Sequence, residues 1–259
     1  MISEKLPYKR IAIKIGSNVL TRNDGKLNTK RISQIVDQIA ELHRRGVQVI
    51  LISSGAVAAG KGEYSFIKET PEISAKQVWS AIGQVKLMVN YFSLFGSYNI
   101  QAAQLLATKE NFQGLRYYSN MENCLSAMLD NKIIPVINEN DTITVTELMF
   151  TDNDELSGLI ASMMNCDALF ILTVVDGVFT SHPSENGAEL LRELDAVDKT
   201  FEKFISPQKS FFGKGGMNTK CTVAQKAAIQ GINVHIASGI RDNILLDIID
   251  GNDAPHTFF

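Results

Sequence analysis

The segment Thr151-Asp152-Asn153-Asp154-Glu155 places three carboxylates in five positions, directly before a stretch with helical periodicity. Thr151 with Asp154, or Asp152 with Glu155, has the spacing of a helix cap and its partner, and acids at a helix start complement the helix dipole. One cap is enough for one helix, so a surplus carboxylate is available to hold a lysine or a magnesium ion. Both interpretations stay open, because capping and function can fall on neighbouring residues.

A glycine-rich loop with two lysines, Gly213-Lys214-Gly215-Gly216-Met217-Asn218-Thr219-Lys220, comes directly before another predicted helix. The backbone N–H groups of such a loop can surround a triphosphate, while Lys220 adds a point charge. A surface loop with hydrated lysines is the alternative. The Gly-Lys-Ser/Thr loop of P-loop hydrolases and the Gly-x-Gly-x-x-Gly fingerprint of NAD enzymes do not occur in the sequence, so neither class is favoured.

Three further loops follow predicted strands and are small, polar or glycine-bearing. They are Lys14 with Gly16-Ser17, Ser53-Ser54-Gly55, and Asn138-Glu139-Asn140-Asp141. In a parallel α/β sheet, ligands bind beyond the carboxyl ends of the strands, where glycine permits close approach and helix N-termini favour anions. These residue types therefore suit a phosphate. The four histidines have no metal-ligand spacing, and the sequence has no Gly-x-Ser-x-Gly elbow of serine hydrolases.

Alternating strands and helices must position these loops. Apolar runs predict strands over residues 10–15, 47–52, 100–107, 133–137, 168–175 and 232–237. Helical spacing predicts helices over residues 29–45, 75–98, 119–131, 154–164 and 219–230. The β-branched residues 142–145 suggest a small hairpin outside the main sheet. Strands that are apolar throughout are typical of a sheet covered on both faces, so the predicted fold class is α/β, a three-layer αβα sandwich with a mostly parallel central sheet.

The composition is that of an ordinary globular protein with room for a sizeable core. The chain has 259 residues, of which 45% are hydrophobic and 20% charged, and a formal net charge of −3. This charge gives no general attraction to nucleic acid or anionic lipid, and no apolar run approaches the ~20 residues of a membrane span. Three separated cysteines fit a reducing, cytoplasmic location. Without a linker-like segment, we expect a single domain over residues 1–259.

Five blocks, taken together, resemble the amino-acid kinase superfamily and, within it, the glutamate 5-kinase family. They are Ile13 to Leu20 (IKIGSNVL), Ser53 to Gly60 (SSGAVAAG), Pro135 to Asp141 (PVINEND), Asp152 to Ser157 (DNDELS) and Gly215 to Lys220 (GGMNTK). The third and fourth blocks distinguish this family from kinases of acetylglutamate, aspartate or UMP. The resemblance implies the amino-acid kinase fold and ATP-dependent phosphorylation of L-glutamate to L-glutamyl 5-phosphate, the first step of proline biosynthesis.

The resemblance also implies roles for single residues. Lys14, Lys220 and Asp154 would form the catalytic set, in which the lysines meet the ATP phosphates and Asp154 holds them in place. Ser54, Asp141 and Asn153 would bind glutamate. Nucleotide contacts would fall on Lys14, Gly16, Ser17, Thr173, Val174, Lys214, Gly215, Gly216, Met217, Asn218, Thr219 and Lys220. Mg²⁺ is expected with ATP, and no residue is assigned as a metal ligand. The glutamate-binding loops would lie mainly in residues 1–165 and the nucleotide-binding part mainly in residues 166–259.

Two positions depart from the family pattern. Val174 follows Thr173 where the family usually has Asp, and Lys214 stands where a small residue usually opens the glycine loop. Both departures concern nucleotide recognition and not the acceptor site. Many family members also carry a C-terminal RNA-binding-like PUA domain, and a chain that ends at Phe259 is expected to be the catalytic domain without it.

This chemistry agrees with the residue inventory. A glutamate side chain, with an ordinary pKa of about 4.3, is ionised at neutral pH and needs no general base. Its approach to a triphosphate is opposed by charge, since two like charges about 4 Å apart repel by roughly 4 kcal/mol at an effective dielectric near 20. Two lysines and a magnesium ion would offset that repulsion, so phosphoryl transfer becomes mainly positioning and charge stabilisation.

The resemblance further implies a homo-oligomer, a dimer or a tetramer, with possible feedback inhibition by proline and possible hand-over of the product to glutamyl phosphate reductase. The expected small-molecule partners are L-glutamate and ATP, and neither nucleic acid nor a membrane is expected as a partner. Two alternatives remain open. One is a kinase of the same fold that acts on acetylglutamate or carbamate. The other is a nucleotide- or amino-acid-binding regulator without catalysis, which Val174 in place of an acid suggests.

Overall fold

The structure is a computed structural model that describes residues 6–22, 24–144, 150, 152–198 and 216–259. Within these residues, one sheet of seven strands has the order β3-β4-β2-β1-β5-β8-β9, in which β9 runs antiparallel to β8 and the other neighbours are parallel. Its strands are β1 (Arg10–Ile15), β2 (Gln48–Ser53), β3 (Ala102–Ala107), β4 (Ile134–Glu139), β5 (Ala168–Thr173), β8 (Asn233–Ser238) and β9 (His256–Phe258). The short strands β6 (Val178–Phe179) and β7 (Leu190–Leu191) pair separately.

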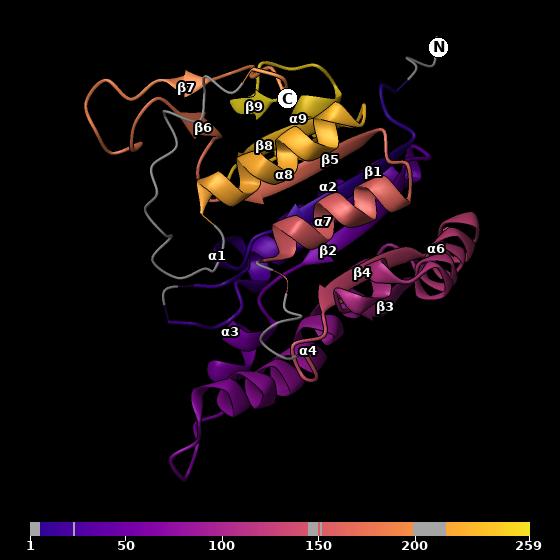
Figure 1. Ribbon diagram of the computed structural model, residues 1–259, viewed down its shortest axis with the longest axis vertical. Coiled ribbons are helices and arrows are strands. Elements are labelled where there is room, and N and C mark those ends of the chain that lie inside the picture. Colours follow the sequence, from indigo (N-terminus) through magenta and orange to yellow (C-terminus); the bar gives the residue numbers. More distant parts are fainter. Residues whose placement is uncertain (1–5, 23, 145–149, 151, 199–215) are drawn as a thin grey trace.

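Helices cover both faces of this sheet (Figure 1). Buried side chains of α2 (Thr29–Arg44), α4 (Glu72–Gly96) and α9 (Ile244–Ile249) form a core with one face. Those of α6 (Leu115–Asp130), α7 (Asn153–Met163) and α8 (Met217–Ile229) form a core with the other face. The remaining helices are short: α1 (Ser17–Leu20), α3 (Ala56–Lys61) and α5 (Glu110–Gln113). The predicted three-layer α/β class is therefore confirmed.

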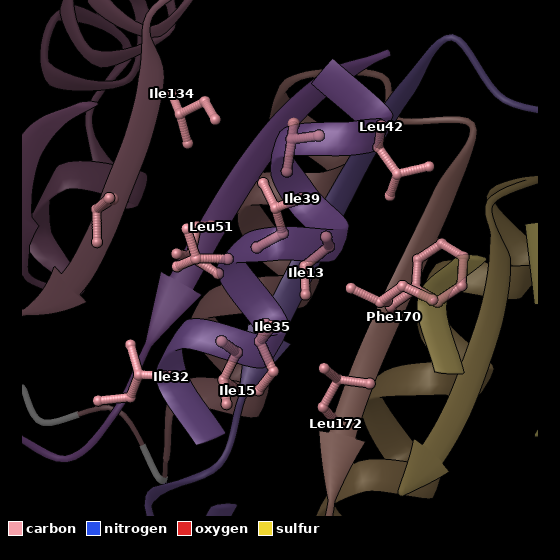
Figure 2. Packing of buried hydrophobic residues seen from close by; sticks show 14 of the residues in the cluster. Ile13, Ile15, Ile32, Ile35, Ile39, Leu42, Leu51, Ile134, Phe170 and Leu172 are labelled. Atoms are coloured by element: carbon pink, nitrogen blue, oxygen red, sulfur yellow. The ribbon is translucent and has the colours of Figure 1, made fainter. Parts of the chain in front are cut away.

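The central strand β1 shows how the sheet divides its side chains. Ile13 and Ile15 point toward Ile35 and Ile39 of α2, as Figure 2 shows for this core. Ala12 belongs to the core on the opposite face, where α7 packs against β1. Because successive side chains of a strand alternate between faces, the lysine two positions after Ala12 is directed to the α7 side.

Most predicted elements are present, with ends shifted by a few residues. The strand predicted to continue to residue 175 ends at Thr173, and the helix predicted from residue 119 begins at Leu115. The hairpin predicted at 142–145 is wrong for the three of its residues that the structure describes. Instead, the backbone N–H and the hydroxyl of Thr144 both donate to the carbonyl oxygen of Asn140, which closes a turn directly after β4. Residue 145 lies outside the described residues.

A close crossing of α3 and α4 depends on two glycines. A Cβ on Gly83 of α4 would lie 1.8 Å from the carbonyl oxygen of Ala56, and one on Gly60 of α3 would lie 1.8 Å from that of Trp79. Only glycine permits this approach. The crossing therefore holds α4 against the start of α3, next to the loop that follows β2. In the described part of the chain, we find no helix with the length and apolar character needed to cross a bilayer.

Candidate active site

Two ammonium groups share one carboxylate at the N-terminus of α7. Nζ of Lys14 lies 2.5 Å from Oδ1 of Asp154, and Nζ of Lys220 lies 3.0 Å from Oδ2 of the same residue. All three side chains are buried. Two ammonium groups thus lie next to each other in a poorly hydrated place, on the two oxygens of one carboxylate. Electrostatic interactions of ammonium groups with an anion are stronger in such surroundings than at a hydrated surface.

Three separate elements deliver these side chains. Lys14 comes from β1 at the centre of the sheet, Asp154 from the first turn of α7, and Lys220 from the first turns of α8. Helices α7 and α8 lie side by side on one face of the sheet (Figure 1). The structure thus brings together the three residues that the sequence analysis assigned to the catalytic set.

The two acids at the start of α7 have opposite pKa shifts. Burial by itself would raise the pKa of Asp154, but the charges of Lys14 and Lys220 outweigh it and lower this pKa to about 2. Burial, and then the negative charge of Asp154, raise the pKa of Asp152 to about 6. Asp154 is therefore ionised at neutral pH and acts as a counter-ion to both lysines.

Asp152 provides the cap of α7. Its Oδ1 accepts hydrogen bonds from the backbone N–H groups of Asp154 at 2.8 Å and Glu155 at 3.3 Å. Capping and ion pairing thus fall on neighbouring residues, which the sequence analysis left open. The cap satisfies two backbone donors that a helix N-terminus otherwise leaves without partners.

A second group of polar side chains lies beside the ion cluster. Nδ2 of Asn153 donates to Oγ of Ser54 at 3.0 Å and to Oδ1 of Asn138 at 2.8 Å. Asp141, in the turn after β4, accepts a hydrogen bond from Oγ of Ser80 at 3.2 Å. Two of the residues expected to bind the acceptor, Ser54 and Asn153, are in direct contact. Asp141 follows β4 at the same carboxyl-terminal edge of the sheet, where it contacts Ser80 of α4.

The loop after β1 leaves room next to Lys14. The backbone N–H of Gly16 donates to the carbonyl oxygen of Leu172 at 3.0 Å. A Cβ on Gly16 would lie 3.3 Å from that oxygen and 3.7 Å from Nζ of Lys14. A side chain at Gly16 would therefore crowd the carbonyl oxygen and contact the ammonium group, and Ser17 begins α1 immediately afterwards.

The remaining expected nucleotide contacts fall at the ends of β5 and α8. Thr173 is the last residue of β5, and Val174 after it is exposed. Gly216 is the N-cap residue of α8 and has no side chain to satisfy the free N–H groups there; Met217, Asn218 and Thr219 begin the helix. Lys214 and Gly215 lie outside the described residues.

Sequence reasoning missed the contribution of α4. Ser80 and Gln84 of this helix are buried polar residues, and Gln84 accepts a hydrogen bond from Asn138. They share a helix face with the core residues Leu87 and Tyr91. Polar residues on the apolar face of a predicted helix were the signal that could have found them.

The residues at the site fit a metal ion only as part of a nucleotide complex. Among the described residues, no group of three or more His, Cys, Asp or Glu is placed to hold a metal ion. Oδ2 of Asp152 is buried without a hydrogen-bond partner in the part of the chain that the structure describes, while both oxygens of Asp154 face lysines. Magnesium commonly uses one or two carboxylates together with substrate phosphates.

Sequence comparison agrees with this arrangement. The profile of the amino acid kinase family matches residues 9–238. A glutamate 5-kinase of Bacteroides thetaiotaomicron is 51% identical to this chain over 96% of the chain and 69% of the relative. A glutamate 5-kinase of Chlorobaculum tepidum is 46% identical over 97% of the chain and 69% of the relative.

Solved structures show the same fold at much lower identity. A UMP kinase from Bacillus anthracis superposes with a TM-score of 0.63 at 21% identity, over 97% of this chain and 96% of that one. A substrate complex of isopentenyl phosphate kinase superposes with a TM-score of 0.68 at 17% identity, over 96% and 99%. The solved structures support the fold alone. The sequence relatives, at 46% and 51% identity, indicate the particular family within this fold. The chain belongs to the amino acid kinase family and, within it, to the glutamate 5-kinases.

Proposed function

We propose that this protein transfers the γ-phosphoryl group of ATP to the side-chain carboxylate of L-glutamate, forming L-glutamyl 5-phosphate and ADP, the first step of proline biosynthesis. The observation that carries the proposal is the ion cluster: two buried lysines on one carboxylate, directly beside the polar group of Asn153 and Ser54. The choice of L-glutamate as the acceptor rests on the relatives, which are glutamate 5-kinases. The assignment of phosphoryl transfer rests on the paired lysines of the ion cluster.

The mechanism needs charge compensation more than proton transfer. A glutamate carboxylate is already ionised at neutral pH, so attack on the γ-phosphorus requires no general base. Lys14, at the end of β1, would stabilise charge between the acceptor and the γ-phosphate, and Lys220 would act from the start of α8. Asp154, with its pKa lowered to about 2, positions both ammonium groups and takes no proton.

The two substrates would occupy different parts of the chain. We assign glutamate to Ser54, Asp141 and Asn153, mainly within residues 1–165. We assign ATP to Lys14 and to the loops around Gly16, Thr173 and Gly216, with much of that site in residues 166–259. Mg²⁺ bound with the nucleotide would neutralise part of the phosphate charge; Asp152, whose Oδ2 has no hydrogen-bond partner among the described residues, is the side chain best placed to contact it.

The proposal extends to assembly and regulation. An exposed apolar strip on α4, formed by Val78, Val85, Val89 and Phe92, supports a homo-oligomer, because such a strip is stabilised when a second surface covers it. Inhibition by proline and hand-over to glutamyl phosphate reductase follow from the resemblance to the family. The lability of an acyl phosphate in water supports the hand-over.

The experiment that tests the function is hydroxamate trapping of the acyl phosphate, with ATP and Mg²⁺ present. We expect hydroxamate formation and ADP release that depend on L-glutamate, with little product from N-acetylglutamate or carbamate. Product from one of those acceptors without product from glutamate would assign the chain to another small-acid kinase. Binding of ATP and glutamate without ADP release would identify a regulator.

A further inference from the structure

A chain of three buried side-chain amides runs from α4 to the proposed acceptor site. Nδ2 of Asn138 donates to Oε1 of Gln84 at 2.8 Å, and Nδ2 of Asn153 donates to Oδ1 of Asn138 at 2.8 Å. The three residues are 3% (Asn138), 7% (Gln84) and 8% (Asn153) exposed. We call this group the amide relay. It links a residue in the middle of α4 to a residue in the first turn of α7.

Two backbone groups decide which way the amides face. The N–H of Glu139 donates to Oδ1 of Asn138 at 2.9 Å, and the carbonyl oxygen of Ser53 accepts from Nδ2 of Asn153 at 3.2 Å. An N–H can only donate and a carbonyl oxygen can only accept, so both asparagine orientations are determined by chemistry. The NH₂ group of Asn138 then faces Gln84 as a donor, so the side-chain oxygen of Gln84 must be the acceptor.

The orientation of Gln84 has a cost. Its Nε2 is buried and has no hydrogen-bond partner among the described residues. A buried donor without a partner destabilises the fold, so packing alone does not explain a glutamine at this position. Gln84 directly follows Gly83, which packs against the carbonyl oxygen of Ala56 at the start of α3. The helix crossing therefore holds the amide beside the loop that carries Ser54.

At the other end of the relay, the hydrogen bonds of Asn153 determine which of its side-chain atoms remains for a ligand. Nδ2 of Asn153 faces three oxygens, those of Ser53, Ser54 and Asn138, and its Oδ1 accepts no hydrogen bond from the described residues. The end of Asn153 that remains for a ligand is thus an acceptor. An ammonium group is a donor only. An N-acylated amine carries no such charge and offers at most one N–H.

We propose that Gln84 is a positioning residue for acceptor specificity. Through Asn138, it holds Asn153 with Oδ1 available to the α-ammonium group of a free amino acid. The relay selects L-glutamate over acids of the same length without an ammonium group. This inference rests on the proposed function, in which Asn153 belongs to the glutamate site.

The test compares L-glutamate with glutarate, which keeps both carboxylates and lacks the ammonium group. For Gln84→Met we expect the KM for L-glutamate to rise about tenfold with kcat within about twofold, and the KM for glutarate to stay within about twofold. The preference for L-glutamate then falls about tenfold, equivalent to about 1.4 kcal/mol. An unchanged preference, or an equal rise in both KM values, would overturn the proposal.

Gln38→Met is the matched control. Gln38 is also a buried glutamine on a helix, and its side chain accepts from the N–H of Leu245 and donates to the carbonyl oxygen of Gln34. We expect this variant to unfold at a lower temperature without any change in acceptor preference. Gln84→Glu keeps an oxygen toward Asn138, so it should retain at least the wild-type preference. Loss of preference in Gln84→Glu would contradict the relay even if Gln84→Met failed to fold.

A binding measurement separates failure of the relay from failure of the proposed function. Thermal shift without ATP reports whether L-glutamate stabilises the wild-type protein more than glutarate does, and whether Gln84→Met abolishes that difference. If this pattern appears without hydroxamate formation, the relay stands and the proposed reaction fails. If L-glutamate and glutarate give equal shifts in the wild-type protein, the relay inference is wrong whatever the reaction.

Discussion

The ion cluster and the amide relay meet at consecutive residues, Asp154 and Asn153, yet the first consists of charged groups and the second of neutral amides. The ion cluster uses full charges on long side chains from β1 and α8. The relay uses short neutral amides from β4, α4 and α7, linked by directional hydrogen bonds. Charge acts over several ångströms in a poorly hydrated site, whereas an amide discriminates only at hydrogen-bond distance. The contrast suggests that the cluster governs the rate of transfer and the relay governs the choice of acceptor.

The largest effect is expected from breaking the ion cluster. Asp154→Ala and Lys220→Ala should each lower kcat by about 10³-fold, because the transition-state charge loses an organised ammonium group. Steady-state kinetics with saturating L-glutamate and ATP measures this. Asp154→Ala should also destabilise the fold by about 3–5 kcal/mol, since it removes the carboxylate that both buried lysines contact.

The matched control for the cluster is Glu155→Ala. Glu155 is the next acid in the same helical turn, and its side chain pairs with Lys109 near the surface. Exposed pairs of this kind contribute about 0–1 kcal/mol, so kcat should change by less than about threefold. If Asp154→Ala kept a near-normal kcat, or if both variants lost activity equally, the role of the cluster would be refuted.

A smaller effect, on substrate binding, is expected at the polar group. Asn153→Ala should raise the KM for L-glutamate by about 10- to 100-fold, and Ser54→Ala by about threefold to tenfold, with smaller changes in kcat. Ser157→Ala is the control, because Ser157 lies one turn further along α7 and its hydroxyl donates to the backbone carbonyl oxygen of Asp154 within that helix. An unchanged KM in Asn153→Ala would remove this residue from the acceptor site.

The smallest effect concerns the contribution of Asp152 to the free energy of unfolding, which depends on pH. Its pKa is raised to about 6 in the folded protein, so ionisation disfavours folding as pH rises from about 4 to about 6. Asp152→Asn keeps an oxygen for the helix cap and removes the charge. The variant should gain about 1–3 kcal/mol over wild type at pH 7 and nothing at pH 4.

Urea unfolding at the two pH values measures this difference. Asp154 has the opposite sign: its lowered pKa stabilises the fold above its unfolded value near pH 4, and this contribution is lost as pH falls toward 2. A gain for Asp152→Asn of the same size at pH 4 and pH 7 would show that charge at Asp152 is not its origin.

Local patterns were enough for the main strands and helices. The helix predicted over 29–45 is α2, Thr29–Arg44, and Gly46 beyond it adopts a φ of 91°, which few other residues tolerate. The hairpin expected at 142–145 failed because β-propensity says nothing of the carbonyl oxygen of Asn140, to which Thr144 bonds instead. The antiparallel edge strand β9 was also missed, since its three residues carry no periodic signal.

The sequence by itself determined which side chains end the central strands and begin α7 and α8, because these follow from local periodicity and turn chemistry. It also carried the motifs by which the family is recognised. Only the tertiary structure decided that Lys14 and Lys220 lie on the two oxygens of one buried carboxylate, and that Gln84 reaches the acceptor site from α4. Distances between residues far apart in the chain, and the loss of water that gives those contacts their strength, arise when the layers pack together.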